Sequence, residues 1–125
     1  MTRTERRQFK RYSAPEASFA VFTSDYERLG QVKNISKGGL LFEYMADENY
    51  RNPVESELEI DIFISRDSFY LSKIPCKIIR DSQVVPNHSM ITSIRMRQCG
   101  IQFKDLDLEA AHLLDALLHR CEPLH

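Results

Sequence analysis

The sequence lacks the features of several protein classes. No apolar stretch approaches the roughly 20 residues that a membrane-spanning helix requires, so we expect no insertion into a membrane. The N-terminal segment is charged where a signal peptide has an apolar core, which argues against secretion. No internal repeat, low-complexity tract or linker rich in Gly, Ser or Pro divides the chain. These absences predict a single cytoplasmic domain.

Cysteines are few and widely spaced. Cys76, Cys99 and Cys121 are odd in number, and their spacing matches neither a disulfide framework nor a CxxC motif for metal binding or redox chemistry. We expect reduced thiols, with Cys76 and Cys99 buried in strands.

The sequence also lacks a recognisable catalytic or metal-binding arrangement. It contains no nucleophile–base pair, phosphate loop or paired carboxylates that can be placed in one pocket, so we expect no enzyme activity and no cofactor. His112 and His119 fall near one face of a predicted helix, but His119 and Cys121 diverge by about 200°. No carboxylate completes a tetrahedral set with them. We therefore expect no metal.

The composition is that of an ordinary globular domain, with a basic arm at its start. The 125 residues are 42% hydrophobic and 28% charged, which suits one domain with its own core. The net charge is −1, yet basic residues are concentrated in TERRQFKRY (4–12). Because the first dozen residues lack apolar periodicity, we expect a flexible arm at 1–12 and a single domain at 13–125.

Strand-like segments follow the arm. The clearest is ELEIDIFI (57–64), in which aliphatic residues alternate with other side chains, the pattern of a strand with one buried face. Further strands are predicted at 17–22, 30–36, 39–44, 70–80 and 90–103.

Glycine and proline mark the expected irregularities. Gly30 is assigned to the turn before a strand, and Gly38 and Gly39 to a tight turn where both can take positive φ. Pro75 cannot donate to a sheet ladder, so it should lie at an edge or a bulge. Gly100 is expected to mark a second irregularity.

The pattern changes to that of a helix after Phe103. Over about 105–121, one stripe at a spacing of 3.6 residues contains Leu106, Ala110, Leu113, Leu114, Leu117, Leu118 and Cys121. Asp105 or Asp107 can cap its start. A lone amphipathic helix needs a surface to cover, and a small barrel has an open end. We therefore predict an all-β fold with a C-terminal α-helix, built as a six-stranded antiparallel β-barrel.

Two motifs connect the arm to the predicted barrel. Arg7 and Arg11 form RxxxR, preceded by Arg6, and NISKGG (34–39) forms NxSxxG at the junction of two predicted strands. Together they resemble the PilZ domain, the bacterial receptor module for cyclic di-GMP. Its pattern is RxxxR in an N-terminal loop, followed by (D/N)xSxxG at the start of a split β-barrel. CGIQFKDL (99–106) is similar to the family's GvxF strand, so the resemblance extends over almost the whole chain.

The resemblance implies a binding site for cyclic di-GMP. Arg7 and Arg11 would be its principal contacts, and Arg6 would favour a stacked pair of ligand molecules. The barrel side of the site would be formed by Asn34, Ser36, Gly38 and Gly39. Arginine suits this ligand because it forks onto phosphate, pairs with guanine O6 and N7, and stacks on flat rings. Asn34 replaces the more usual Asp of the family, which removes a carboxylate that could accept from guanine N1 and N2.

The function implied by the resemblance is that of a sensor. Binding of cyclic di-GMP would order the arm and signal to a separate, unidentified partner protein. The alternative is a PilZ-fold adaptor that acts without ligand. Such members of the family generally lack both motifs, which this chain keeps.

Simpler explanations of the same residues remain open. The arm can be a solvated basic tail, and NISKGG can be a hairpin turn in which Asn34 and Ser36 bond local backbone. Phe9 and Tyr12 could stack on bases of RNA or DNA. The predicted sheet shows no basic stripe, so we expect no nucleic-acid polymer as partner. Arg95 and Arg97 share one strand face, either an exposed face or an extension of the positive surface.

Overall fold

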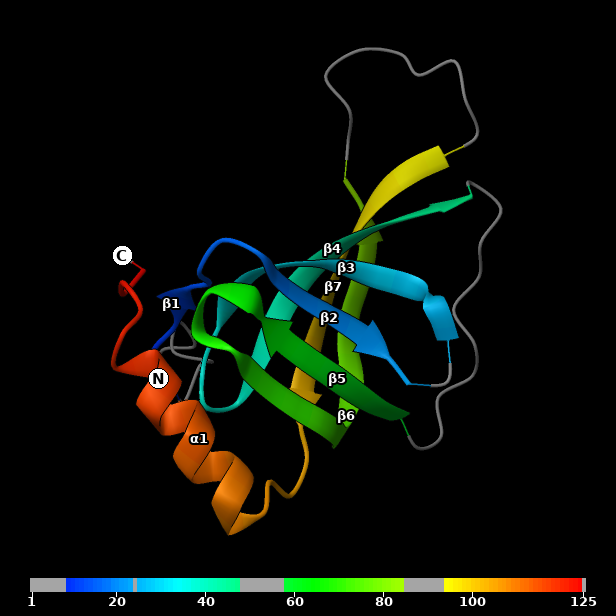
Figure 1. The fold of residues 1–125 in the computed structure, drawn as a ribbon. Helices are drawn as coiled ribbons and strands as arrows, with labels where there is room; N and C mark the ends of the chain where they lie inside the picture. The colour runs from blue at the N-terminus through cyan, green and yellow to red at the C-terminus, as the bar shows by residue number, and fades with distance from the viewer. Residues whose placement is uncertain (1–8, 24, 48–57, 85–93, 125) are drawn as a thin grey trace, which may run out of the picture.

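The computed structural model describes residues 9–23, 25–47, 58–84 and 94–124. Most of the predicted arm, including Arg6 and Arg7, lies outside the described residues. The described residues form seven strands, one short 3₁₀ helix and one α-helix (Figure 1). In chain order they are β1 (Tyr12–Ser13), β2 (Ser18–Phe22), β3 (Asp25–Ile35), β4 (Gly39–Asp47), β5 (Leu58–Ile64), η1 (Ser65–Asp67), β6 (Phe69–Gln83), β7 (Ile94–Phe103) and α1 (Leu108–Leu118).

Six of the strands close into an antiparallel barrel. Their order is β3-β2-β5-β6-β7-β4, and β4 pairs again with β3 to close the ring. The short β1 pairs beside the end of β3, with Tyr12 opposite Ile35 and Ser13 opposite Asn34. The predicted six-stranded antiparallel barrel with a C-terminal helix is confirmed.

The core follows the alternation of the sequence. In β5 the aliphatic side chains at 58, 60, 62 and 64 are all buried, while Glu59 and Phe63 face outward. Cys76 and Cys99 are fully buried in β6 and β7, as expected, and are not joined in a disulfide. Burial raises the pKa of the Cys99 thiol to about 12. This thiol therefore stays protonated and unreactive at neutral pH.

The two irregularities expected in the sheet are present. Between β5 and β6 the register shifts at Asp61, whose carboxylate accepts from the Lys73 amide at 2.8 Å. Pro75 itself stays in register opposite Glu59, but it lies beyond the last residue pair between β6 and β7, which is an edge position. Between β6 and β7 the register shifts at Ile79, next to the pair of Arg80 with Gly100. Each shift is a β-bulge, in which one strand contributes an extra residue.

Two of the glycines, Gly30 and Gly39, serve close approach of backbones and not the expected backbone conformation. Gly30 lies within β3 and not in a turn, and none of the four glycines has positive φ. A Cβ at Gly30 would overlap the Glu43 carbonyl oxygen, and one at Gly39 would overlap the Ile101 carbonyl oxygen. The expectation of positive φ at Gly38 and Gly39 is therefore wrong.

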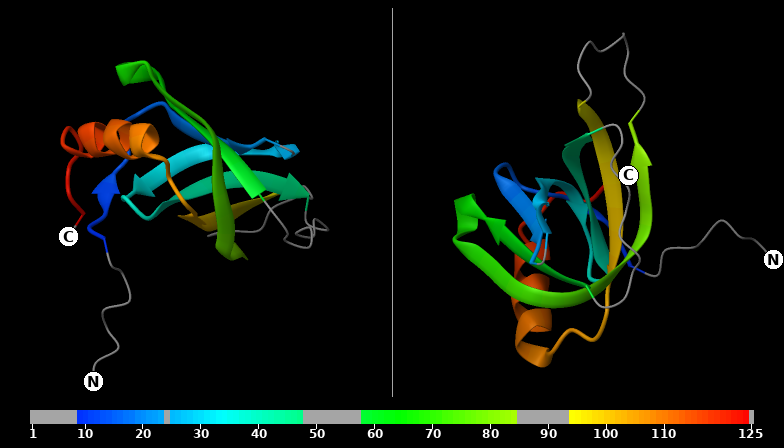
Figure 2. Two further views of the ribbon diagram at one scale, coloured as in Figure 1. Left: turned by 90° about the horizontal axis from the view of Figure 1, so that it is seen from below. Right: turned by 90° about the vertical axis from the view of Figure 1, so that its right-hand side faces the viewer.

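The helix α1 packs its apolar side on the barrel core. It lies at the end of the barrel where β1 and η1 are found (Figures 1 and 2). Asp107 caps its start by accepting from the Ala110 amide at 2.8 Å. The apolar stripe is narrower than predicted, because Leu113 is 44% exposed; the buried positions are Ala110, Leu114, Leu117 and Leu118. Of the helices in the described residues, none is long and apolar enough to cross a membrane.

A cluster of polar side chains lies inside the barrel, away from the β3–β4 turn. The Asp81 side chain is 1% exposed and accepts from the Tyr44 hydroxyl at 2.6 Å and from Arg97 Nε at 2.9 Å. Burial by itself would lower the pKa of Arg97, but the hydrogen bond and charge of Asp81 raise it. Arg28 is also buried, with its guanidinium 4.2 Å from the centre of the Phe22 ring. Arg97 is therefore part of this inner cluster and not of an exposed positive face.

Candidate ligand-binding site

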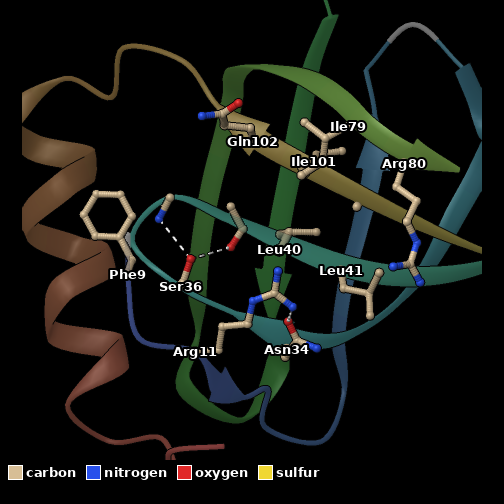
Figure 3. A pocket seen from close by; sticks show the side chains of 13 residues that line it. Phe9, Arg11, Asn34, Ser36, Leu40, Leu41, Ile79, Arg80, Ile101 and Gln102 are labelled. Atoms are coloured by element: carbon tan, nitrogen blue, oxygen red, sulfur yellow. Dashed lines mark hydrogen bonds between the residues drawn. The ribbon is translucent and has the colours of Figure 1, made fainter. Parts of the chain in front are cut away.

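A pocket of about 410 Å³ lies between the segment before β1 and the surface of strands β4, β6 and β7 (Figure 3). It is lined by Phe9, Arg11, Asn34, Ser36, Gly38, Gly39, Leu40, Leu41, Ile79, Arg80, Gly100, Ile101 and Gln102. Every predicted site residue that the structure describes is in this group: Arg11, Asn34, Ser36, Gly38 and Gly39. The two sequence motifs therefore meet in space.

Strand pairing brings the end of the RxxxR motif to the NxSxxG motif. Because Ser13 pairs with Asn34, Arg11 reaches the same strand end, and its Nη1 lies 3.4 Å from Asn34 Oδ1. The C-terminal tail holds the other side of this segment. The Leu124 amide donates to the Arg11 carbonyl at 2.9 Å, and the Ser13 amide donates to the Glu122 carbonyl at 2.8 Å.

The NISKGG turn is closed by its own serine. The Ser36 hydroxyl accepts from the Gly38 amide at 3.0 Å and donates to the Gly39 carbonyl at 3.4 Å. Ser36 therefore does bond local backbone, as the simple hairpin explanation expects, and the same bonds fix the shape of the pocket wall. Asn34 differs, because its amide oxygen points to Arg11 (Figure 3).

Neighbouring elements fix the position of this turn. The Gly38 carbonyl accepts from the Phe103 amide at 2.8 Å, which joins the turn to β7. Lys37 pairs with Asp115 of α1 at 3.3 Å. The Phe9 ring packs on Gly38, where an added Cβ would lie 2.7 Å from a ring carbon. A rigid wall thus faces the segment that carries Arg11.

Several pocket residues were not identified from the sequence. Leu41, Ile79, Arg80 and Gln102 come from three strands that are far apart in the chain. Each strand was predicted, but the register that places these side chains together was not. The only local signal was Gly100, which was expected to mark an irregularity.

The lining can hold a ligand that is both anionic and aromatic. Arg11 and Arg80 supply guanidinium groups for phosphate or a base edge. Asn34 and Gln102 supply amide donors and acceptors, and Leu41 and Ile79 supply apolar surface for a flat ring. Within the described part of the chain, no three His, Cys, Asp or Glu side chains are grouped so that they could hold a metal ion.

A second pocket, of about 560 Å³, lies on the other side of Phe9. Its walls are the segment before β1, the start of the C-terminal tail and the last turn of α1. Phe9 lines both pockets, so the segment that carries Arg11 separates them.

Comparison with known proteins agrees with this architecture. The family model of the PilZ domain matches residues 5–120, which include both motifs. No curated protein matches the chain. Among solved structures, the PilZ domain with c-di-GMP of YcgR from Escherichia coli is similar, with a TM-score of 0.64 and 14% sequence identity. The match covers 92% of this chain and 90% of that one. At this identity the structural likeness concerns the fold alone, but the match of the family model over nearly the full length shows that the chain belongs to the PilZ domain family.

Proposed function

We propose that this protein is a cytoplasmic sensor that binds cyclic di-GMP in the pocket beside the NISKGG turn. The observation that carries the proposal is the convergence of the two motifs: Arg11 and Asn34 are in contact, and Ser36, Gly38 and Gly39 line the same pocket. Membership of a family of ligand-binding domains supports it, as does the likeness to a PilZ structure that contains c-di-GMP.

The proposed binding mode divides the site into a fixed and a closing part. Asn34, Ser36 and Gly39 form the fixed part on the barrel. Arg7 and Arg11 close from the arm and address the phosphates and guanine edges, because a guanidinium forks onto both. Arg6 contacts a second, stacked molecule of the ligand.

Ligand binding orders the arm, and this change signals to a separate partner protein. The arm is predicted to be disordered without ligand because of its polar composition. A ligand that binds only the closed arm shifts the population toward that state. The change is positioned to affect the C-terminal tail and α1, since the segment at Arg11 contacts both the tail and the second pocket.

An adaptor that acts without ligand is the competing function. The observation in its favour is a row of aromatic side chains across the outer face of β2, β5 and β6. Phe19 and Phe63 have ring centroids 5.8 Å apart, and Phe63 and Tyr70 have centroids 6.4 Å apart. Phe63 is 36% exposed and Tyr70 56%. Exposed aromatic residues are enriched in protein interfaces.

Calorimetric titration of the purified protein with cyclic di-GMP separates the two functions. The sensor gives saturable heat with cyclic di-GMP and much weaker heat with GTP or cyclic di-AMP. Asn34→Ala should weaken binding, whereas Lys33→Ala, on the neighbouring exposed residue, should leave it unchanged. Absence of saturable binding to cyclic di-GMP would overturn the sensor and leave the adaptor.

A further inference from the structure

The pocket has a second half that neither motif supplies. In Figure 3, Leu41 and Arg80 lie on the side of the pocket away from Phe9 and Ser36, and Ile79 lies above Leu41 beside Ile101. Leu41 comes from β4, and Ile79 and Arg80 come from β6. The chemistry of this half can be derived from three features of the sheet.

The first feature is the bulge in β6. Successive residues of a regular strand point to opposite faces, but the register shift between Ile78 and Arg80 leaves Ile79 without a partner residue on β7. As a result, Ile79 and Arg80 both line the pocket although they are adjacent in sequence. Ile79 is 58% exposed there. Bulges are frequent beside binding sites because they redirect side chains in this way.

The second feature is the glycine opposite the bulge. Gly100 does not have positive φ, so its backbone conformation is open to any residue. A Cβ at this position would lie 3.7 Å from Ile79 Cγ1, 3.8 Å from Arg80 Cβ and 3.9 Å from Leu41 Cδ1, all ordinary van der Waals distances. Neither conformation nor packing therefore requires glycine, and glycine weakens a strand. What glycine leaves is a depression between three pocket residues, with Gly100 itself buried at its floor.

The third feature is the way Arg80 is held. Its Nη2 donates to Gln98 Oε1 at 3.2 Å, and Gln98 Nε2 donates to Glu43 Oε2 at 2.9 Å. This chain of hydrogen bonds crosses β6, β7 and β4 on the outer face. The direct partner of Arg80 is an uncharged amide, so this contact fixes the guanidinium at the edge of the floor without neutralising it.

We infer that Leu41, Ile79 and Gly100 form a platform for the flat face of one guanine base, and that Arg80 reads its O6 and N7 edge. An apolar floor takes an aromatic ring, and a fixed guanidinium beside it matches the two acceptors that guanine presents there. Adenine presents an amino donor at the same edge, which repels the donors of Arg80. Arg80 is thus the residue that selects guanine. This inference rests on the proposed function.

Three variants test the platform, with affinity for cyclic di-GMP and for cyclic di-AMP as readouts. Gly100→Ala should retain or raise the thermal unfolding temperature, because alanine fits the backbone and the space. It should weaken cyclic di-GMP binding about 10- to 100-fold, since one methyl group on the floor displaces the base. Arg80→Met should weaken cyclic di-GMP binding by a similar factor. It should also lower the preference over cyclic di-AMP.

Arg80→Lys distinguishes recognition of the guanine edge by the planar guanidinium from simple attraction by a positive charge. Lysine keeps the positive charge but loses the planar fork, so this variant should behave like Arg80→Met in selectivity. The control is Arg66→Met, which removes an exposed arginine from η1 outside the pocket. It should change neither affinity nor selectivity.

The outcomes distinguish the two proposals. If the wild-type protein binds cyclic di-GMP and the Gly100 and Arg80 variants bind it equally well with unchanged selectivity, the platform is wrong and the sensor stands. If Arg80→Lys retains wild-type selectivity, the planar fork of the guanidinium is not what selects guanine, and the proposed reading of the guanine edge by Arg80 is overturned. If the wild-type protein does not bind cyclic di-GMP, the proposed function fails and the platform fails with it.

Discussion

Arginines inside the barrel and arginines at the pocket are held by different partners. Arg97 pairs with the buried carboxylate of Asp81, and buried Arg28 covers the ring of Phe22. At the pocket, Arg80 donates to the side-chain amide of Gln98. Amide partners orient a guanidinium but carry no charge, whereas a carboxylate cancels its charge.

This difference separates arginines of the fold from arginines of the site. A buried cation must be compensated within the protein, because an unpaired charge in the interior costs several kcal/mol. A cation that binds an anionic ligand must instead remain available to it. Changes at the inner cluster should therefore affect stability, and changes at the pocket should affect binding.

The largest expected effect is at the inner cluster. Asp81→Ala leaves the partly buried Arg97 without its carboxylate, and breaking a buried pair costs about 3–5 kcal/mol. We expect a fall of this size in the free energy of unfolding, measured by urea denaturation. Where the variant remains folded, its affinity for cyclic di-GMP should be unchanged. Glu59→Ala, at an exposed position of β5, should change stability by less than about 0.5 kcal/mol. Equal stability of the two variants would show that the inner pair is not structural.

Arg11→Ala should weaken ligand binding and leave the stability of the fold unchanged, the reverse of what we expect for Asp81→Ala. Loss of a charge-assisted contact costs about 2–3 kcal/mol, which corresponds to about a 30- to 150-fold weaker affinity for cyclic di-GMP. Arg7→Ala should have a similar effect in calorimetric titration. Arg3→Ala lies outside the motif and should have little effect, and none of the three should alter the unfolding temperature appreciably. Small and equal losses at all three positions would indicate a merely electrostatic tail.

Arg6 should control stoichiometry more than affinity. A second ligand molecule brings two more negative charges to the site, which an additional cation makes tolerable, and stacking adds about 1–3 kcal/mol per base. The wild-type protein should bind two molecules of cyclic di-GMP and Arg6→Leu one, as counted by calorimetry. A wild-type stoichiometry of one would remove this role from Arg6.

The smallest expected change is confined to the arm. The part of the arm that precedes Phe9 should tumble faster than the barrel without ligand and at the same rate with it, because its composition gives it no core of its own. Heteronuclear NMR relaxation measures both states. The backbone amides of Arg28 and Arg97 serve as the internal reference, and their relaxation should be the same with and without ligand. An arm that is already as rigid as the barrel without ligand would contradict ordering by the ligand.

The sequence predicted the elements of this fold better than their relative positions. Alternation in 57–64 identified β5 because burial of one face is a local property of a strand. Arg80 and Gln102 were not predicted as site residues. Their place in the pocket depends on the register between β6 and β7, which a pattern within one strand does not encode. Gly38 and Gly39 were assigned correctly to a turn but for the wrong reason. The carbonyl and the ring that exclude a side chain there belong to Ile101 and Phe9.

Arg97 shows the same limit of sequence-based prediction, because it was expected on an exposed face and lies in the inner cluster. Its spacing from Arg95 places both on one strand face, but it does not reveal that this face turns toward Asp81 in a neighbouring strand. The candidate site was recognised through its two motifs. The half of the pocket without a motif became visible only in three dimensions.

The pairing of the C-terminal tail with β1 joins two distant segments of the sequence beside the candidate site. Tyr12 bridges to Pro123, and the backbone of Arg11 is held by the amide of Leu124. These bonds depend on backbone atoms, so substitution scanning of side chains would pass over them. A tag, label or fusion partner attached directly after the tail would stand beside Arg11, where it could obstruct the proposed ligand or report its arrival. Placement of the tag is thus an experimental variable for this protein, and affinities measured with N-terminal, C-terminal and removable tags need to be compared before they are assigned to the native chain.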